Sequence, residues 1–556
     1  MIKHALCFLT FLSFLCTQPL WAQTTISGTV SASDTRQGLA DVSVYIEPSF
    51  QLVQTDSRGY YQFDVVQDGV YKLTFAPINY QSVTDTLTIK ANASIVHNVQ
   101  LVQLNETLNE VNITANSSNQ EVYAIHTHLP SVTFDGIYAA KKNDVINIDK
   151  LNANLATNNS RQIFATVAGL NIWESDGGGL QLGIGGRGLS PNRTSNFNTR
   201  QNGYDISADA LGYPESYYTP PTEALQRIEL IRGAASLQYG TQFGGMLNFV
   251  FKDGASDKRL AITSRQTTGS WGLFSSFNSI GGTLKVAKGL QYYSFFQHKR
   301  GNGWRPNSGF SVNTAHAGAK LQVNSRLKLG LEYTLMQYQA QQAGGLSDAL
   351  FDQNPQQSVR ERNWFKVHWQ LGAFTSDYDF SSRTHLNNRT FALLAKKDAL
   401  GFLGVITRAD PLTERDLLAD TFKNIGHESR LMHKYYIGDN PATLLVGARV
   451  YQGKSTKKQG LGNNSYDPDF VYLNPDNLEK SDYTFPSFNG ALFVENLFNI
   501  SPKLSITPGF RLEYIKTAAA GYYRKTVKDF AGNIIEDISL EESKDRTRYL
   551  HLFGLG

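Results

Sequence analysis

Cysteine is nearly absent from this chain of 556 residues, since its two cysteines, Cys7 and Cys16, both lie close to the start. Residues 1–22 combine a short basic beginning, an apolar run from Ala5 to Leu15 and a small residue at the end, which is typical of a secretory signal peptide. We therefore expect these residues to be removed, leaving an exported chain without cysteine that cannot be a disulfide framework. Lipid attachment at Cys16 is the alternative, but a large leucine precedes this cysteine where a small residue would be needed.

Blocks of like charge and long apolar runs are also absent. Loss of the signal peptide removes one lysine and no acidic residue, so the mature chain has a net charge of +3. The even mixture of charges argues against a nucleic-acid partner and against a polybasic membrane tether. After the signal peptide no window offers about eighteen consecutive apolar residues, so we expect no membrane-spanning helix.

Aromatic residues, in contrast, are frequent, with 27 Tyr and 32 Phe. From Lys258 onward the sequence repeats amphipathic segments of about ten residues with Tyr or Phe near their ends, such as LQYYSFFQHKR and LKLGLEYTLMQY. Short connections alternate with long polar ones, such as residues 339–362 and 455–482. This pattern predicts an antiparallel transmembrane β-barrel over residues 253–556. A soluble β-propeller is the alternative, but the sequence shows no blade-length period.

The region that follows the signal peptide, residues 23–103, shows short segments with period-two alternation separated by turn residues. Six or seven such strands in about eighty residues predict a small β-sandwich. The strings TDSRGYYQF and GVYKLTFAPINY resemble the carboxypeptidase regulatory-like domain, which implies a module for binding or spacing without chemistry of its own.

Residues 104–125 are polar and rich in Asn and Ser, as expected of a linker. Within this linker, Leu108 to Ala115 forms a short strand-like segment with an acidic residue before alternating apolar ones. Such a segment could add itself to the sheet edge of a partner protein. The pattern is equally compatible with the last strand of the preceding sandwich, and both interpretations stay open at this point.

Residues 126–252 mix short helices and strands and are rich in glycine. Ser160 is a plausible N-cap of one helix, and Pro220-Pro221 a plausible start of another. The string GIGGRGL is not a dinucleotide-binding loop, because a proline and polar residues follow it where a helix is required. Glu229 and Arg232 lie within an otherwise apolar strand, and their burial without partners would cost several kcal/mol. An α/β plug inside a barrel, with polar surroundings, would accommodate this charged pair.

Three strings carry a more specific resemblance: SRQIFATVAGLNIWE, LGIGGRGLSPNRTSNFNTRQNGYDI and YPESYYTPPTEALQRIELIRGAASLQYGTQFGGMLNFV. With them, residues 24–556 resemble a TonB-dependent outer-membrane receptor of the type that carries an N-terminal extension. Together with AGGLSDALFDQNPQQSVRERNWF, they are most similar to the ferric dicitrate transporter branch. The resemblance implies a mainly β protein with a β-sandwich, an α/β plug and a transmembrane barrel, located in the outer membrane with the N-terminal domain and the plug face periplasmic.

The resemblance also implies a mechanism and site residues. A ferric chelate would bind at the extracellular face, and a periplasmic segment, the TonB box, would bind TonB, which draws on the proton gradient. The residues that match the TonB box are Glu110, Val111, Ile113 and Thr114. The candidates for binding a carboxylate chelate, which favours arginine as a bidentate donor, are Arg187, Arg193, Arg200 and Arg360. Tyr213 stands where the branch carries glutamine, which weakens the case for dicitrate itself.

Other chemistry is poorly represented. His126 and His128 would share a strand face, but one histidine pair in a polar stretch is more typical of solvated surface than of a metal site. No nucleophile–base set or carboxylate pair points to an enzyme, and no cofactor is expected. Import of a glycan or peptide, and adhesion with the barrel as a mere anchor, remain the alternatives to iron uptake.

The C-terminal end departs from the family pattern. Transporters of this family use about 22 strands, whereas the roughly 300 residues after Lys258 provide about a dozen. An open half-barrel would expose unpaired backbone groups to lipid. The sequence therefore predicts a partial barrel, and we expect the chain to be a fragment.

Overall fold

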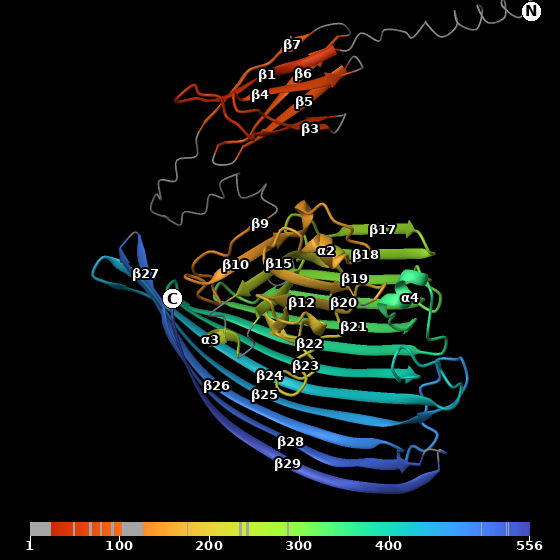
Figure 1. Ribbon diagram of the computed structural model, residues 1–556. Helices are drawn as coiled ribbons and strands as arrows, with labels where there is room; N and C mark the ends of the chain where they lie inside the picture. The colour runs from red at the N-terminus through yellow and green to blue at the C-terminus, as the bar shows by residue number, and fades with distance from the viewer. Residues whose placement is uncertain are drawn as a thin grey trace, which may run out of the picture. The chain divides into compact units, whose positions relative to one another are not determined.

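The computed structural model describes residues 24–47, 51–65, 69–77, 80–90, 94–102, 126–174, 176–232, 236–240, 244–285, 289–501, 503–529, 531 and 533–556. The chain divides into two compact units, Met1–Thr114 and Ala115–Gly556. Both units are built mainly of β-strands (Figure 1), which confirms the predicted fold class. No helix within these ranges is long and apolar enough to cross a membrane.

The first unit is a β-sandwich. One sheet has the order β4-β1-β7, with β8 also paired to β1, and the other has the order β3-β2-β5-β6. Alternate residues of both sheets, among them Ile26, Val44, Phe63 and Leu73, are buried in one shared core. This alternation is the pattern from which the sandwich was predicted. The strands are β1 (Thr24–Ala32), β2 (Ser43–Glu47), β3 (Gln51–Gln54), β4 (Tyr60–Val65), β5 (Gly69–Ala76), β6 (Val83–Ile89), β7 (Ile95–Val96) and β8 (Val99–Leu101).

The second unit begins with the plug. Its main sheet has the order β14-β13-β16-β15-β10-β9, and a separate hairpin pairs β11 with β12. The strands are β9 (His126–Thr127), β10 (Lys142–Asn147), β11 (Leu170–Glu174), β12 (Leu182–Gly186), β13 (Phe197–Gln201), β14 (Tyr204–Asp205), β15 (Leu225–Arg232) and β16 (Gly245–Phe251). The short helices are η2 (Ile148–Lys150), α2 (Ser160–Ile163), η3 (Asn192–Thr194), η4 (Thr222–Ala224) and α3 (Ser236–Tyr239).

The glycine-rich stretch around β15 and β16 shows why glycine is needed there. Gly245 opens β16 with a φ of +112°, a conformation that side chains disfavour. A Cβ atom at this position would lie 2.0 Å from the carbonyl oxygen of Ile231 on β15. The two strands can therefore approach each other only because residue 245 has no side chain.

The two expected plug helices differ in detail from the structure. Asn159, and not Ser160, caps α2, because its side chain accepts a hydrogen bond from the backbone N–H of Gln162. Ser160 is instead the first residue of that helix. The prolines at 220 and 221 precede only the single turn η4, since Leu225 already has an extended backbone and begins β15.

A 13-stranded antiparallel sheet follows the plug and curves around it (Figure 1). Its path runs from β17 to β29 in sequence order, with β27 set aside on β26. The strands are β17 (Ala261–Gly269), β18 (Leu273–Leu284), β19 (Leu290–Gly301), β20 (Phe310–Gln322), β21 (Leu327–Gln341), β22 (Trp364–Ser381), β23 (Thr384–Gly401), β24 (Arg415–Ile437), β25 (Asn440–Gly462), β26 (Ser481–Ser501), β27 (Leu504–Ile506), β28 (Pro508–Lys528) and β29 (Ile534–Leu555). Helix α4 (Asp348–Gln353) lies in the connection before β22.

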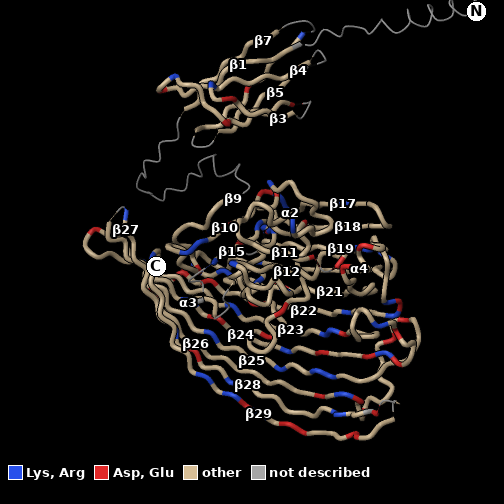
Figure 2. Tube along the Cα trace, in the orientation of Figure 1, with Lys and Arg blue, Asp and Glu red and all other residues tan. Residues whose placement is uncertain are grey.

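The faces of this sheet differ in character. Alternate residues of the central strands, such as Trp369 and Phe391, are buried in one core with apolar residues of the plug. Their neighbours on the opposite face include exposed apolar residues such as Leu394, Ile425 and Leu492. Acidic and basic residues are interspersed over both units (Figure 2), as the sequence indicated. The plug therefore packs against the inner face, and the outer face carries apolar side chains.

Candidate functional site

The strand connections define two ends of the 13-stranded sheet. Residues 342–363, 402–414 and 463–480 form long connections at one end, which we call the loop end. Residues 382–383 and 438–439 form short connections at the opposite end, which we call the turn end. The predicted alternation of short and long connections is thereby confirmed.

Two tyrosines of the plug lie side by side near the loop end. Tyr213 closes a tight turn through two backbone hydrogen bonds with Asp209, of 2.9 and 3.0 Å. Its hydroxyl oxygen lies 2.6 Å from that of Tyr217, and the two rings are nearly parallel, with 12° between their planes. Phe422 of β24 also stacks on the Tyr213 ring, with 5.5 Å between centroids. These contacts hold both phenol rings in one orientation.

Three basic side chains surround the two tyrosines. The Nζ atom of Lys457 on β25 lies 4.1 Å from the centre of the Tyr213 ring. The Nζ atom of Lys397 on β23 lies 5.1 Å from the Tyr217 ring, and the guanidinium carbon of Arg193 lies at the same distance. We call these five residues, from the plug and from two strands of the sheet, the loop-end cluster.

The charges of the loop-end cluster are only partly neutralised. Arg193 pairs with Glu215 at 3.0 Å, and Lys397 pairs with Asp420 at 2.6 Å. Among the residues that the structure describes, Lys457 has no carboxylate within ion-pair distance. Two of the three cations thus have a direct carboxylate partner, whereas Lys457 interacts with Asp420, Glu215 and Asp209 only at longer range.

Protonation of the cluster favours hydrogen-bond donation. Burial and the neighbouring Tyr213 raise the pKa of the Tyr217 hydroxyl well above its ordinary value. Burial lowers the pKa of Arg193, but Tyr217 and Glu215 outweigh it, so that the pKa is raised. The Tyr217 phenol therefore stays neutral and the guanidinium stays charged, and a cationic guanidinium suits an anion that carries several oxygen acceptors.

The backbone that presents Arg193 is in an unfavourable conformation. Arg193 has a φ of 46° and Thr194 a φ of 58°, which is rare for a β-branched residue. The Thr194 hydroxyl holds this turn in place, since it donates to the carbonyl of Leu182 at 2.7 Å and accepts from the N–H of Ile184 at 3.2 Å. Strain of this kind persists only where surrounding contacts enforce it, and it is frequent at ligand-binding positions.

Arg187, the first expected ligand contact, lies outside the loop-end cluster. It follows β12 on an exposed turn, and its backbone N–H donates to the carbonyl of Gly169 at 3.3 Å. The opposite end of this hairpin approaches the loop end, because Lys299 near the end of β19 donates to the carbonyl of Gly178. Arg187 therefore lies at the other end of the hairpin, about 16 Å along the strand from the end that approaches the loop end. Of the arginines expected to contact the ligand, the structure brings Arg193 into the loop-end cluster.

Arg200 serves the attachment of the plug to the sheet. Its fully buried guanidinium forms two hydrogen bonds with the carboxylate of Glu428 on β24, at 2.7 and 2.9 Å. Arg449 on β25 donates to the same carboxylate and to Asp205 of the plug, each at 3.1 Å. Arg430, also on β24, lies 3.4 Å from Glu428. We call these residues the Glu428 cluster, and in it Arg200 has an internal partner in place of a ligand.

Arg360 organises a loop. It is buried, and its guanidinium donates to five backbone carbonyls, four of them between residues 402 and 408. Two further buried arginines act in the same way, since Arg362 pairs with Asp410 at 2.6 Å and Arg415 donates to the carbonyls of Asn463 and Asp467. The three arginines fasten the long connections together at the loop end.

The plug charges Glu229 and Arg232 are buried and paired, although not with each other. Arg232 pairs with Asp144 on β10 and donates to the carbonyl of Ala168 at 2.8 Å. Glu229 accepts from Arg227 and from Asn248, both at 2.8 Å. All these partners belong to the plug, so the charged strand is accommodated by the plug itself and not by the wall that surrounds it.

Two further expectations concern the TonB-box segment and a metal site. The TonB-box match Glu110, Val111, Ile113 and Thr114, the linker and the signal peptide lie outside the described residues. In the described ranges no group of three or more His, Cys, Asp or Glu side chains could hold a metal ion. The Nδ1 atom of His128 donates a hydrogen bond to the carbonyl of Asn143.

Several functional candidates were not visible in the sequence. Lys397, Lys457, Tyr217 and Glu428 look like ordinary members of alternating strands or of a polar plug segment. Their grouping depends on the register of β23, β24 and β25 and on the seating of the plug. The one available signal was the string YPESYY, which combines aromatic rings with an acidic residue beside Pro220-Pro221.

Comparison with known proteins gives two domain matches. Residues 26–113 match the family model of the CarboxypepD_reg-like domain. Residues 128–246 match the model of the TonB-dependent receptor plug domain. The two matches agree with the resemblances drawn from the sequence.

Solved structures share the fold. The chain is similar to the ferric citrate transporter FecA in its unliganded form, with 20% identity and a TM-score of 0.59 over 73% of this chain and 59% of that one. The open form of the ferric-catecholate import receptor Fiu of E. coli K12 has 13% identity and a TM-score of 0.55, over 76% and 68% of the two chains. The ferric preacinetobactin receptor BauA of Acinetobacter baumannii has 14% identity and a TM-score of 0.54, over 72% and 67%. This chain thus spans three fifths to two thirds of their lengths, and at these identities the likeness concerns the fold.

Proposed function

We propose that this chain, which carries the plug domain and the fold of TonB-dependent receptors, imports an anionic ferric chelate of the citrate type across the outer membrane. The observation that carries the proposal is the loop-end cluster, where three cations and two tyrosine hydroxyls converge between the plug and the sheet. The cluster faces the end of the barrel that bears the long loops, which is the extracellular end in outer-membrane barrels.

The chemistry of the loop-end cluster suits a carboxylate chelate of iron. Arginine and lysine bind carboxylate oxygens through charge-assisted hydrogen bonds, and Lys457, which has no direct ion pair in the described part of the chain, supplies a charge for a bound anion. Tyr213 replaces the glutamine of the dicitrate branch with a phenol, which also donates a hydrogen bond. Ferric citrate and related hydroxycarboxylate chelates are the ligand class that these donors match best.

The proposal includes a location and a partner. The chain would lie in the outer membrane, with the N-terminal domain and one face of the plug in the periplasm. Glu110, Val111, Ile113 and Thr114 would bind TonB, which couples import to the proton gradient of the inner membrane. The chain would act as a transporter and not as an enzyme. Arg193 is the leading ligand contact, while Arg360 would act through the shape of the loops.

Binding of ferric citrate to the purified chain tests the ligand. Lys457→Ala is expected to weaken binding about tenfold or more, because one charge-assisted contact is lost. Lys454→Ala is the matched control, since Lys454 is an exposed lysine on the same strand and outside the loop-end cluster. Equal affinities of the two variants would contradict the assignment of the loop-end cluster as the ligand site.

Alanine variants of Arg193 and Arg187 show which of these two plug arginines contacts the ligand. Arg193→Ala is expected to lower the affinity for ferric citrate about tenfold, by the same reasoning. Arg187→Ala is expected to leave it unchanged, because Arg187 lies at the far end of its hairpin. Isothermal titration of both variants measures the difference, and a larger loss with Arg187→Ala would return the site to that turn.

Glycan import is the second candidate, favoured by the stacked rings of Tyr213 and Tyr217, which could support a sugar. The same titrations decide between the candidates. Binding of neutral oligosaccharides that Lys457→Ala leaves intact would favour a glycan, whereas binding that depends on this lysine favours the anionic chelate.

A further inference from the structure

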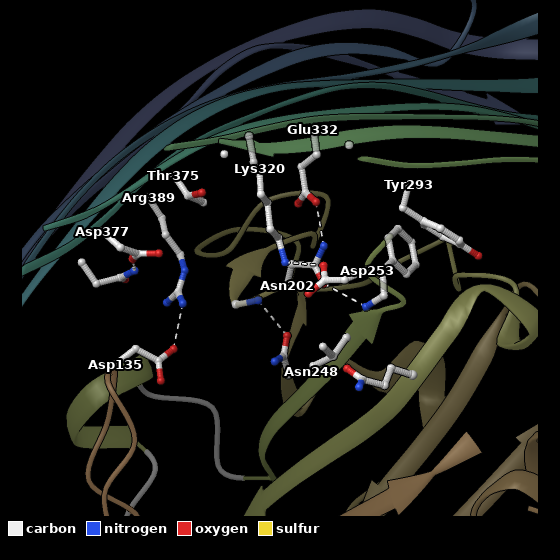
Figure 3. A pocket seen from close by; sticks show the side chains of 18 of the residues that line it. Asp135, Asn202, Asn248, Asp253, Tyr293, Lys320, Glu332, Thr375, Asp377 and Arg389 are labelled. Carbon is white, nitrogen blue, oxygen red and sulfur yellow. Dashed lines mark hydrogen bonds and ion pairs between the residues drawn. The ribbon is translucent and has the colours of Figure 1, made fainter. Parts of the chain in front are cut away.

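A cavity of about 320 Å³ lies between the plug and the sheet, away from the loop-end cluster. Its wall is formed by the inner face of β20, β21, β22 and β23 toward their turn end, and its floor by plug residues near 135, 202 and 253. Figure 3 shows side chains of both partners pointing into this space. We call it the turn-end cavity.

Small residues at one level of the sheet create the cavity. Gly330 on β21 has Lys320 and Thr375 as its partners on the two neighbouring strands. Two residues further along β21, Glu332 is flanked by Gly318 and Ala373. A Cβ atom at residue 330 would lie 2.3 Å from the hydroxyl oxygen of Thr375, so a larger residue there would force the Thr375 side chain to move. Nearer the loop end, the inner face of these strands carries large buried side chains such as Trp369, and the cavity stops there.

Three polar contacts cross the turn-end cavity from the plug to the sheet. Asn202 donates to Glu332 at 2.6 Å, Lys320 donates to Asp253 at 2.5 Å, and Arg389 donates to Asp135 at 2.7 Å (Figure 3). Two of these contacts are single ion pairs and the third involves a neutral amide. None has the bidentate geometry with which Arg200 binds Glu428, so each of these polar contacts is weaker than that pair.

The cavity is polar without an excess of either charge. Lys320 and Arg389 are paired with plug carboxylates, and Lys328 lies directly opposite Asp377 on the neighbouring strand. The buried Asn387 also lines the cavity, and its side-chain amide donates to Asp377. A polar lining with balanced charge lets a charged solute pass without holding it, which a conduit requires.

We propose that the turn-end cavity is the exit chamber through which an anionic ferric chelate leaves the boundary between plug and sheet toward the periplasm. This inference rests on the proposed function. The loop-end cluster, with its three converging cationic side chains, retains the chelate, and the cavity, which lacks such a convergence, releases it. Separation of the three crossing contacts widens the chamber while the Glu428 cluster keeps the plug attached on its other side.

A single engineered cysteine at position 375 tests the exit chamber, because the chain has no cysteine after residue 16 and labelling has no background within it. Thr375→Cys is labelled with a fluorescein maleimide, whose adduct fills the cavity, and Ser376→Cys on the outward face of the same strand is the matched control. The labelled Thr375→Cys protein is expected to bind ferric citrate with unchanged affinity and to lose uptake of radiolabelled ferric citrate. The labelled Ser376→Cys protein is expected to keep both. Thr375→Trp, which fills the cavity without chemistry, is expected to behave as the labelled Thr375→Cys protein does.

The outcomes separate this inference from the proposed function. Unchanged uptake by both the labelled Thr375→Cys protein and Thr375→Trp would overturn the exit chamber while import itself stands. Loss of binding together with uptake would also overturn it, because the cavity would then belong to the ligand site. Failure of the unlabelled chain to bind ferric citrate would refute the proposed function, and the exit chamber would fall with it.

Discussion

The plug contacts the sheet in two very different ways. Against β24, β25 and β26 it forms buried ion pairs: Arg200 binds Glu428 through two hydrogen bonds, and single contacts join Arg449 to Asp205 and Lys141 to Glu495. Against the turn end of β20 to β23 it forms three single polar contacts across a cavity. The same plug therefore has a bidentate buried anchor on one side and only single polar contacts on the other, as the proposed exit route requires.

The largest expected effect comes from the anchored side. Glu428→Ala leaves Arg200, Arg430 and Arg449 without their shared carboxylate, and unpaired buried charge costs about 3–5 kcal/mol. The midpoint of thermal unfolding in detergent should fall accordingly. Glu332→Ala removes a partner of the neutral Asn202 and should cost about 1 kcal/mol. Equal losses for the two glutamates would break the comparison between the two sides.

The next largest effect on stability is expected from the paired hydrogen bonds between Arg200 and Glu428. Arg200→Lys keeps the charge but loses the paired hydrogen bonds to Glu428, and we expect a loss of about 1–3 kcal/mol in the free energy of unfolding. Arg187→Lys is the control, because Arg187 lies on an exposed turn. A stability of Arg200→Lys equal to that of the control would show that charge alone, without bidentate geometry, anchors the plug.

The sequence predicted the parts and not their contacts. Alternating polarity identified the strands, and the string IELIRG, with its charges, identified a plug strand whose partners proved to be Asp144, Arg227 and Asn248. Arg200 and Glu428 are 228 positions apart, and nothing local to either residue indicates the other. Pairs of this kind depend on strand register and on the seating of the plug, which only the three-dimensional arrangement shows.

The pH dependence of the attachment of the plug to the sheet tests the role of Asp135. Burial alone would raise the pKa of Asp135, but Arg389 and Arg430 lower it below its ordinary value. A depressed folded-state pKa contributes stability that is present above the unfolded value of about 3.9 and is lost as the pH falls through the folded value. Protease protection of the plug should therefore weaken in acid. Asp135→Asn should lack this part of the pH dependence, and an unchanged profile would exclude Asp135 as its source.

The smallest effect is expected at Lys320. Its pair with Asp253 is partly exposed, so Lys320→Ala should change the free energy of unfolding by less than about 1 kcal/mol. Hydrogen exchange of the plug segment near Asp253 should increase, because one crossing contact is lost. A large loss of stability would show that this side of the plug is anchored as firmly as the other.

Uptake of radiolabelled ferric citrate by iron-starved cells that express the chain, with and without a functional TonB, is the most direct test of the account. We expect saturable uptake that requires TonB and that Lys457→Ala reduces. Absence of uptake in cells where the chain is correctly inserted, or uptake that persists without TonB, would contradict the assignment as an energy-coupled importer of a ferric chelate.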